Sequence, residues 1–415
     1  MSGDSHSPAQ LVVARWKRQF NALRDVRRRR GKRHNLHSPV DVVLISLLGM
    51  LCGCDDADEI ADWASERSGL LSSWFVLKHG PPSQDTILRV FSLLNPKSFS
   101  RSVRRWLIRL GPQITGGHIA IDGKTLRGSL RRGAKGETVH LVNAWLRHEG
   151  LCLGQLKTSS KSNELKAIPK LLAELELRGS TVSIDAAGCY KEIAEAIVSQ
   201  KGDYGIALKA NQPTLYADVE RLFAEGLDGR SRSVDELERP EVECFSDTDG
   251  GHGRIEVRTA HLSADLAYLS TARDWVGLRA VGMVISETTD ETTAEVSTDR
   301  RYYLLSHESL SAKQFLELTR GHWSVESMHW VLDVVFKEDA ARIFNRRAAE
   351  NFSLLRKTIL GMLKTAPPPE RARSSRGMSL KRRRRHCGWR PEYMLEVVAA
   401  SLPGFASEPD AAGSQ

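Results

Sequence analysis

The stretch that decides the fold is GHIAIDGKTLRGS, residues 117–129. Its apolar run at 118–121 predicts a buried β-strand that presents one carboxylate, Asp122, at its end, after which Gly123 and Lys124 turn the chain away. A lone acid in this place is also the ordinary end of a strand in an α/β protein. A catalytic site here therefore requires partner carboxylates from elsewhere in the chain.

A second predicted strand, STVSI at residues 180–184, also ends in an acid, Asp185. Before it, the sequence predicts a hairpin of two strands, 138–146 and 151–157, and a helix over 163–178. After it come a predicted helix over 191–199 and one more strand over 204–208. This order of elements is that of a ribonuclease-H-like α/β fold, in which the first and fourth strands are adjacent. The fold would bring Asp122 and Asp185 together.

A third acid is expected on a later helix. Ser311 and Gln314 form a capping-box pattern that predicts a helix start, and a break is expected at Gly321. Glu326 lies on this helix in an unusually aromatic setting, which can mark a functional site. The turn-rich and strand-rich segment before it, about 213–307, is predicted to be a β-rich insertion in the catalytic domain, which spans 115–365.

The N-terminal part predicts a basic arm over residues 1–33 and a small helical domain over 34–110. Ser38 and Ser83 are the expected caps of two of its helices. One helix could enter a DNA major groove as in helix-turn-helix proteins, and the alternative is a packing domain without base contacts. Residues 366–415 are expected to form a second basic segment and a disordered tail.

The overall charge favours a polyanionic partner. Sixty Lys and Arg residues against 51 Asp and Glu give a net charge of +9, with a pI near 9.3, so nucleic acid is the first candidate and an anionic membrane the second. The six cysteines lack a paired spacing and are expected to be reduced. The N-terminus has no signal-peptide pattern and the most apolar window is too short for a bilayer, so a cytoplasmic protein without a membrane partner is expected.

Three converging carboxylates suit phosphodiester chemistry. Two divalent ions held by acids can neutralise the phosphate, activate the attacking hydroxyl or water and stabilise the leaving oxygen. Magnesium prefers oxygen ligands and retains waters, so Asp122, Asp185 and one acid from a later helix would suffice.

Five long segments, in the same order, resemble the ISAs-type insertion-sequence transposases, which include the H-repeat-associated proteins. They are HIAIDGKTLRGS, SNELKAIPKLLAELELRGSTVSIDAAGCYKEIAEAI, GDYGIALKANQPTLY, GHGRIEVR and RGHWSVESMHWVLDVVFKEDAARI. SPVDVVLISLLGMLCG and PPSQDTILRVFSLLNP are similar to the helical domain that precedes the catalytic domain in that family. The resemblance covers roughly residues 20 to 395.

The resemblance implies a DNA transposase of the DDE superfamily that cuts the ends of an insertion sequence and joins them to target DNA. Its implied catalytic and metal-binding acids are Asp122 in IDGK, Asp185 in IDA and Glu326 in HWSVES. Two Mg²⁺ or Mn²⁺ ions per site are expected, with Asp122 bridging both and the other acids each holding one. Family members usually have Asn where this chain has Ser327, and Gln where it has Tyr190.

Several alternatives stay open at this stage. The competing third ligands are Asp333, Glu338 and Asp339. Six side chains are expected to contact phosphates or end DNA: Lys124, Arg127, Lys209, Asn211, Arg320 and His322. Trp323 and Trp330 are expected in the core rather than stacked on bases. The expected partners are element-end and target DNA, with the protein as a homo-oligomer on the DNA. The rival functions are an inactive, DNA-binding transposase remnant and a nuclease that cuts without joining.

Overall fold

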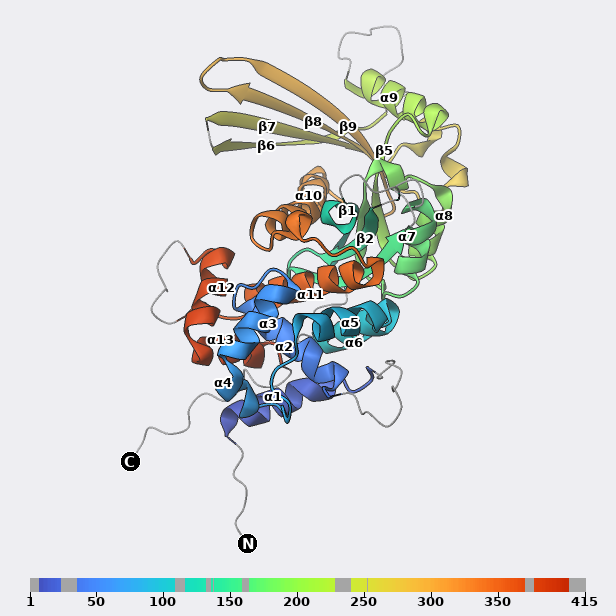
Figure 1. Ribbon diagram of the computed structural model, residues 1–415. Coiled ribbons are helices and arrows are strands. Elements are labelled where there is room, and N and C mark those ends of the chain that lie inside the picture. The colour runs from blue at the N-terminus through green and yellow to red at the C-terminus, as the bar shows by residue number, and fades with distance from the viewer. Residues whose placement is uncertain are drawn as a thin grey trace, which may run out of the picture.

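A computed structural model shows a large sheet lying against a helical body (Figure 1). The described residues are 7–23, 36–108, 116–131, 136, 138–158, 164–227, 240–251, 253–369 and 377–402.

Helices from both ends of the chain build the helical body, in which the blue N-terminal and red C-terminal helices of Figure 1 lie together. These helices are α1 (Pro8–Gln19), α2 (Pro39–Leu51), α3 (Ala57–Glu66), α4 (Ser68–Ser72), α5 (Gln84–Leu93), α6 (Pro96–Ile108), α11 (Arg346–Thr365), α12 (Leu380–Trp389) and α13 (Pro391–Ala400). α2 is buried continuously over residues 42–51, so it needs apolar neighbours on every side. The described part of the chain contains no helix with the length and hydropathy of a membrane span.

α11 joins the helical body to the sheet. Asn345 caps it, accepting hydrogen bonds from the backbone N–H groups of Arg347 and Ala348 at 3.1 and 3.0 Å. Its residues 348–363 are all buried, because the helix contacts β2 and β3 as well as α2, α5 and α6. The two parts of the chain therefore share a helix and a continuous core.

The basic arm expected over residues 1–33 does not hold for residues 8–19, which form α1. Val12, Val13 and Trp16 recur on one face of this helix and are buried, and the Trp16 ring lies 6.0 Å from that of Trp106. The basic residues between α1 and Ser38 fall largely on 24–35, outside the described residues.

The basic segment expected after residue 366 is folded where it is described, as α12 and α13. Ser379 caps α12, and Arg383 and Arg384 are buried within it. The Arg384 guanidinium donates hydrogen bonds to oxygens of Met50, Cys54, Asp55 and Val335. A guanidinium has five donors, so it can tie several segments together from a buried position. Residues 370–376 and 403–415, including the expected tail, lie outside the described residues.

The nine-stranded sheet has the order β3-β2-β1-β4-β5-β9-β8-β7-β6. Its strands are β1 (His118–Leu126), β2 (Val139–Leu146), β3 (Leu151–Thr158), β4 (Thr181–Ile184), β5 (Asp203–Leu208), β6 (Glu243–Gly251), β7 (Arg254–Ser263), β8 (Ala280–Asp290) and β9 (Val296–Leu305). β1 pairs antiparallel with β2 and parallel with β4, which pairs parallel with β5. α7 (Glu164–Leu172) and α8 (Lys191–Val198) pack on these strands. The predicted ribonuclease-H-like order, with the first and fourth strands adjacent, is confirmed.

The predicted turn at Gly123 and Lys124 is wrong. β1 runs on past Asp122 and pairs with β2 as far as Leu126 and Val139. Gly123 is needed for close packing instead, because a Cβ there would lie 2.7 Å from the Nε2 atom of His140.

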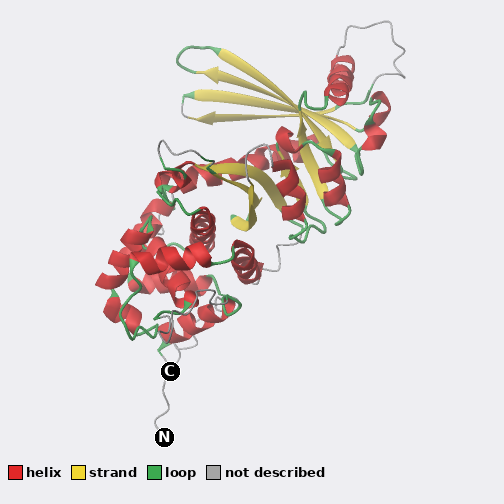
Figure 2. Ribbon diagram, turned by 45° about the vertical axis from the view of Figure 1, so that its right-hand side comes forward, coloured by secondary structure: helices red, strands yellow, loops and turns green. Residues whose placement is uncertain are grey.

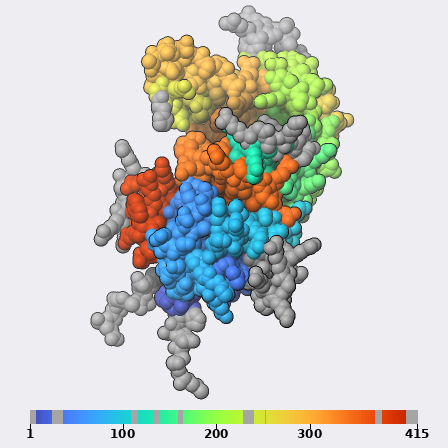
Figure 3. Space-filling model, viewed as in Figure 1, coloured from blue at the N-terminus to red at the C-terminus, as the bar shows by residue number. Residues whose placement is uncertain are grey.

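The predicted β-rich insertion consists of α9 (Pro213–Leu227) and strands β6–β9. It extends the main sheet, because β9 pairs antiparallel with β5 through Gly205–Leu305 and Leu208–Tyr302. Figures 2 and 3 show the far ends of these strands standing out from the body.

α10 (Ala312–Val334) is one unbroken helix, so the predicted break at Gly321 is wrong. Its N-terminus has the predicted capping box between Ser311 and Gln314. Gly321 is explained by the approach of the start of β1: a Cβ would lie 2.6 Å from the Nδ1 atom of His118 and 2.6 Å from the Nη1 atom of Arg147. The glycine lets α10 lie directly on the strands that carry the two Asp residues.

Candidate active site

Asp122 and Asp185 are side by side because their strands are paired. The last paired residues of β1 and β4 are Ile121 and Ile184, and the two acids follow directly. Neighbouring strands are separated by about 4.8 Å. One carboxylate thus comes from within a strand and the other from the residue after a strand.

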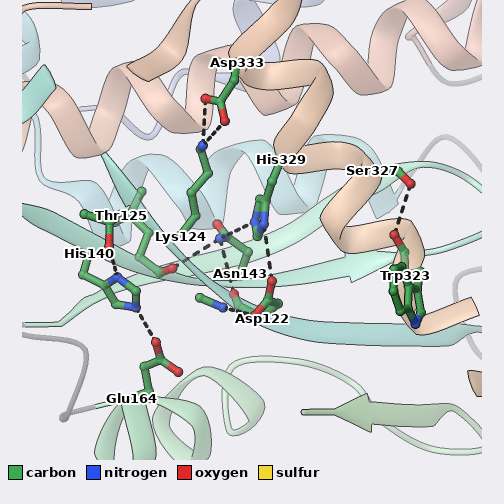
Figure 4. A network of polar contacts seen from close by, with 12 residues as sticks. Asp122, Lys124, Thr125, His140, Asn143, Glu164, Trp323, Ser327, His329 and Asp333 are labelled. Atoms are coloured by element: carbon green, nitrogen blue, oxygen red, sulfur yellow. Dashed lines mark hydrogen bonds and ion pairs between the residues drawn. The ribbon is translucent and has the colours of Figure 1, made fainter. Parts of the chain in front are cut away.

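The Asp122 carboxylate has two fixed partners (Figure 4). Its Oδ1 atom accepts a hydrogen bond of 2.7 Å from the backbone N–H of Gly123, and its Oδ2 atom lies 3.3 Å from the Nδ1 atom of His329 on α10. Burial raises the pKa of Asp122, but the interactions with His329 and the Gly123 N–H outweigh it, so the pKa lies below its ordinary value. Asp122 is therefore ionised at neutral pH.

Asp185 begins a short 3₁₀ turn, Ala186–Gly188, whose position is fixed by the loop after β5. Asn211 donates a hydrogen bond of 3.0 Å to the Ala186 carbonyl, and Gln212 donates one of 3.0 Å to the Cys189 carbonyl. Burial raises the pKa of Asp185, and the negative charges of Asp122 and Glu164 raise it further.

Glu326 faces this pair from α10. It lies four residues after His322 and three before His329, so the three side chains form one stripe of the helix. The Nδ1 atom of His322 lies 2.9 Å from the Ser183 hydroxyl on β4, while His329 contacts Asp122 on β1. The helix is thus attached to both strands on either side of Glu326. Partial burial and the charge of Asp122 raise the pKa of Glu326.

A cavity of about 640 Å³ lies between β4, β5, β9 and α10, and Asp122 is not among its lining residues. Its lining includes five predicted site residues: Asp185, Lys209, Asn211, His322 and Glu326. Arg301 of β9 also lines it and lies with its guanidinium carbon 5.2 Å from the centre of the Trp323 ring. The cavity therefore combines carboxylates with cationic and aromatic groups, as a site for a phosphate-bearing chain would require.

Comparison with known proteins assigns the chain to a family. The family model described as Transposase DDE domain matches residues 114–362, which is more than half of the chain. The family model described as DDE_Tnp_1-associated matches residues 17–107. The chain belongs to the DDE transposase family. The assignment agrees with the ribonuclease-H-like order of strands and with the three carboxylates described above.

Two relatives of this transposase carry provisional transposase names. YncI of Escherichia coli O157:H7 is 33% identical over 94% of this chain and 96% of its own length. The H repeat-associated protein YhhI of Escherichia coli K12 is 32% identical over 88% of this chain and 93% of its own. A solved synaptic complex of piggyBac transposase with hairpin DNA aligns with 95% of this chain and 78% of that chain, at 12% identity and a TM-score of 0.36, a likeness too weak to add to the assignment.

The three competing acids of the transposase are engaged with cations elsewhere. Both Asp333 oxygens accept hydrogen bonds of 2.7 Å from Lys124. Asp339 lies 3.3 Å from Arg127, and the buried Glu338 lies 3.9 Å from Arg356. Glu326 is the acid of α10 that shares a cavity with Asp185.

The six residues expected at DNA occupy different environments. Lys124 is only 7% exposed and pairs with Asp333. Arg320 donates to Asp247 and Asp249 of β6, which holds the insertion against α10. Asn211 and His322 have the internal partners given above. Arg127 is largely exposed, and Lys209 is exposed at the cavity.

Some side chains at the site were missed in the sequence. His329 lies at helical spacing from His322 and Glu326, a local pattern that could have marked it, although its partner Asp122 is remote in the sequence. No local pattern marks Glu164, which pairs with His140, or Arg301 in the insertion. Trp323 and Trp330, expected in the core, are 49% and 63% exposed. Both lie on parts of α10 that the body leaves uncovered.

The carboxylates are the type of ligand that a hard divalent cation prefers. Among the described residues, however, no three His, Cys, Asp or Glu side chains lie close enough together to hold one ion. The donors of Asp122, Asp185 and Glu326 are all oxygens, which Mg²⁺ and Mn²⁺ prefer. Burial first, and then the negative charge of Asp122, raise the pKa of both Asp185 and Glu326, and a bound cation relieves repulsion of this kind. The residues thus fit the group that the family implies.

Proposed function

We propose that this transposase cleaves DNA at the ends of its insertion sequence and joins the freed 3′-hydroxyl to target DNA, with Asp122, Asp185 and Glu326 as its catalytic acids. The observation that carries the proposal is the placement of Glu326 on α10, between two histidines that bind β4 and β1 next to the two Asp residues. This arrangement supports a common role for three carboxylates that come from separate elements.

Divalent ions, when bound, supply charge neutralisation at the phosphate and an activated oxygen nucleophile. Asp122, Asp185 and Glu326 would be the residues that hold these ions. His329 and the Gly123 N–H keep Asp122 ionised and oriented for this role. Asn211 and Gln212 hold the backbone turn that positions Asp185.

The DNA would lie along the cavity and the adjoining face of the β6–β9 insertion. Arg301 and Trp323 line both this cavity and a second one of about 380 Å³ beside it, between the insertion and α10. Arg301 and Lys209 offer cations to phosphates, and Arg127, on the turn after β1, is an exposed cation further along the strand that carries Asp122. Assembly as a homo-oligomer on the DNA stays a prediction of the family resemblance.

The two departures from the family pattern leave the proposed acids in place. The Ser327 hydroxyl donates a hydrogen bond of 3.1 Å to the Trp323 carbonyl within α10. Tyr190 lines the cavity, where its ring replaces the usual Gln. All three proposed acids are therefore present, and no carboxylate is missing that would favour an inactive remnant.

The test is a strand-transfer assay with Mg²⁺ or Mn²⁺, using duplexes that carry the terminal repeats flanking the coding sequence and a plasmid target. Asp122→Ala, Asp185→Ala and Glu326→Ala should each lower the rate by at least about 10³-fold. Glu317→Gln, which neutralises an exposed acid of the same helix, is the matched control and should retain activity.

Each rival predicts a distinct result. Strand transfer that survives in any of the three Ala variants would refute the assignment of that acid. Cut ends without joined product would indicate a nuclease, and DNA binding without either product would indicate a remnant.

A further inference from the structure

A chain of hydrogen-bonding groups runs from Asp122 into the buried centre of the molecule. His329 contacts Asp122 through Nδ1 at 3.3 Å, and its other nitrogen, Nε2, lies 3.4 Å from the Nδ2 atom of Asn143 on β2 (Figure 4). The Oδ1 atom of Asn143 accepts a hydrogen bond of 2.5 Å from Lys357 on α11. Asn143 and Lys357 are fully buried, so this contact is shielded from water.

The neighbours of Asn143 fix the orientation of its amide. On one side Lys357 donates to Oδ1. On the other side the backbone carbonyls of Asp122 and Leu141 lie 3.4 and 3.3 Å from Nδ2, and carbonyl oxygens can only accept. A flipped amide would set its oxygen against both carbonyls. The NH₂ group therefore faces His329 whatever the charge of Lys357.

Lys357 is itself held in place. It donates a second hydrogen bond of 2.8 Å to Oε1 of Gln155, whose Nε2 donates one of 2.7 Å to the Glu350 carbonyl. The lysine thus faces the side-chain oxygens of Asn143 and Gln155. Backbone carbonyls next to the amide nitrogens fix the orientation of both amides. These contacts link β2, β3 and α11 behind the proposed active site.

The amide orientation determines the state of His329. An NH₂ group cannot accept a hydrogen bond, so a protonated Nε2 would place two donors against each other. His329 must carry its proton on Nδ1, from which it donates to the Asp122 carboxylate. Histidines and carboxylates at metal sites are commonly oriented by such partners behind them.

We propose that Asn143, held by Lys357, is a positioning residue that keeps His329 in the Nδ1–H form and thereby orients the Asp122 carboxylate for a divalent cation. The proposal rests on the proposed function for the cation, whereas its first test does not. Asn143 and Lys357 act only through His329 and touch neither DNA nor the reacting atoms.

The first test is the protonation pattern of His329 in the full chain, labelled with ¹⁵N-histidine. Long-range ¹H–¹⁵N spectra distinguish a protonated from a bare ring nitrogen, and the His329 signals are those lost in His329→Asn. The expected pattern is a protonated Nδ1 and a bare Nε2. A protonated Nε2 in the wild-type protein at neutral pH would overturn the proposal, whether or not the protein binds metal.

The second test is calorimetric titration of the full chain with Mn²⁺. Asn143→Leu combined with Lys357→Met removes both buried partners, so neither is left alone, and should weaken Mn²⁺ binding by about 10- to 100-fold. Thr358→Val is the matched control. Among the residues that the structure describes, the hydroxyl of this buried neighbour of Lys357 bonds only within its own helix, to the Leu354 carbonyl at 2.8 Å, so the affinity should be unchanged.

A pair of conservative variants separates positioning from packing. The amide nitrogen of His329→Asn can lie where Nδ1 lay and should keep Mn²⁺ affinity within about threefold, whereas the amide of His329→Gln matches Nε2 and should weaken binding by about tenfold or more. Equal affinities for these two variants, or a folded double variant that binds as tightly as wild type, would overturn the proposal. Wild-type protein that binds no Mn²⁺ would refute the metal site in the proposed function and leave the ¹⁵N result to decide the role of Asn143.

Discussion

The ion pair between Lys124 and Asp333 gives a sharp test, because Lys124 was expected at DNA and the structure places it inside. Its Nζ atom lies 2.7 Å from both Asp333 oxygens and 3.6 Å from Asp339. Exposed pairs contribute about 0.2 to 1 kcal/mol, and breaking a buried pair costs about 3 to 5 kcal/mol. Lys124 is 7% and Asp333 34% exposed, so Asp333→Leu should cost about 2 to 3 kcal/mol.

The assay is a double-mutant cycle by equilibrium urea unfolding, followed by tryptophan fluorescence and checked for reversibility. Lys124→Met should cost only about 1 kcal/mol, since the Asp333 carboxylate left behind can reach water. The double variant should cost less than the sum of the two, giving a coupling free energy of about 2 kcal/mol. Costs that add to within about 0.5 kcal/mol would refute the reasoning.

A DNA-binding measurement completes this test. Loss of one phosphate contact reduces the slope of log affinity against log salt by about one. Lys124→Met should leave that slope unchanged, while Arg127→Ala, which removes a side chain that is 83% exposed, should reduce it. A reduced slope in Lys124→Met would restore Lys124 as a DNA contact.

Three more predictions follow from the site. The pKa of Asp185 is raised, so the metal-free protein gains stability from the protonated form of this residue, and that stability is lost as pH rises from about 4 through the raised pKa. Without metal, Asp185→Asn should therefore raise the melting temperature at pH 7 and have little effect at pH 4. The same variant should abolish stabilisation by Mn²⁺. Gly321→Ala gains about 1 kcal/mol of helix propensity but presses a Cβ against His118 and Arg147, which costs about 1 to 3 kcal/mol. The free energy of unfolding, measured in urea, should therefore fall by about 1 kcal/mol. A stabilised variant would show that α10 does not lie this closely on β1. Arg301→Ala should weaken binding of end DNA and lower the salt slope by about one, and an unchanged slope would remove Arg301 from the DNA path.

Features encoded within a few residues could be predicted from the sequence. The capping box at Ser311 and Gln314 marked the start of α10, and the order of strands and helices placed the first strand next to the fourth. Asp122 and Asp185 became neighbours by that adjacency alone. Capping and strand alternation depend on backbone hydrogen bonds and local burial, so short windows of sequence carry them.

Contacts between distant segments could not be predicted in this way. Asp333 follows Lys124 by 209 residues, and charge alone does not distinguish a lysine on DNA from a lysine paired inside the fold. The same holds for Arg384, which belongs to a run of basic residues and is buried among carbonyl oxygens. A glycine within a helical pattern predicts a break, but the role of Gly321 depends on what lies beside it, which here is the start of β1.

The sequence by itself determined the ribonuclease-H-like core, its β-rich insertion, the family and two neighbouring carboxylates. Only the tertiary structure decided how α10 lies on β1 and β4, and with it the place of Glu326, the contact of His329 with Asp122 and the buried groups behind it. The physical reason is that a strand's place in this fold follows from patterns along the chain, whereas a side chain's partner is decided by the packing of elements that are remote in sequence.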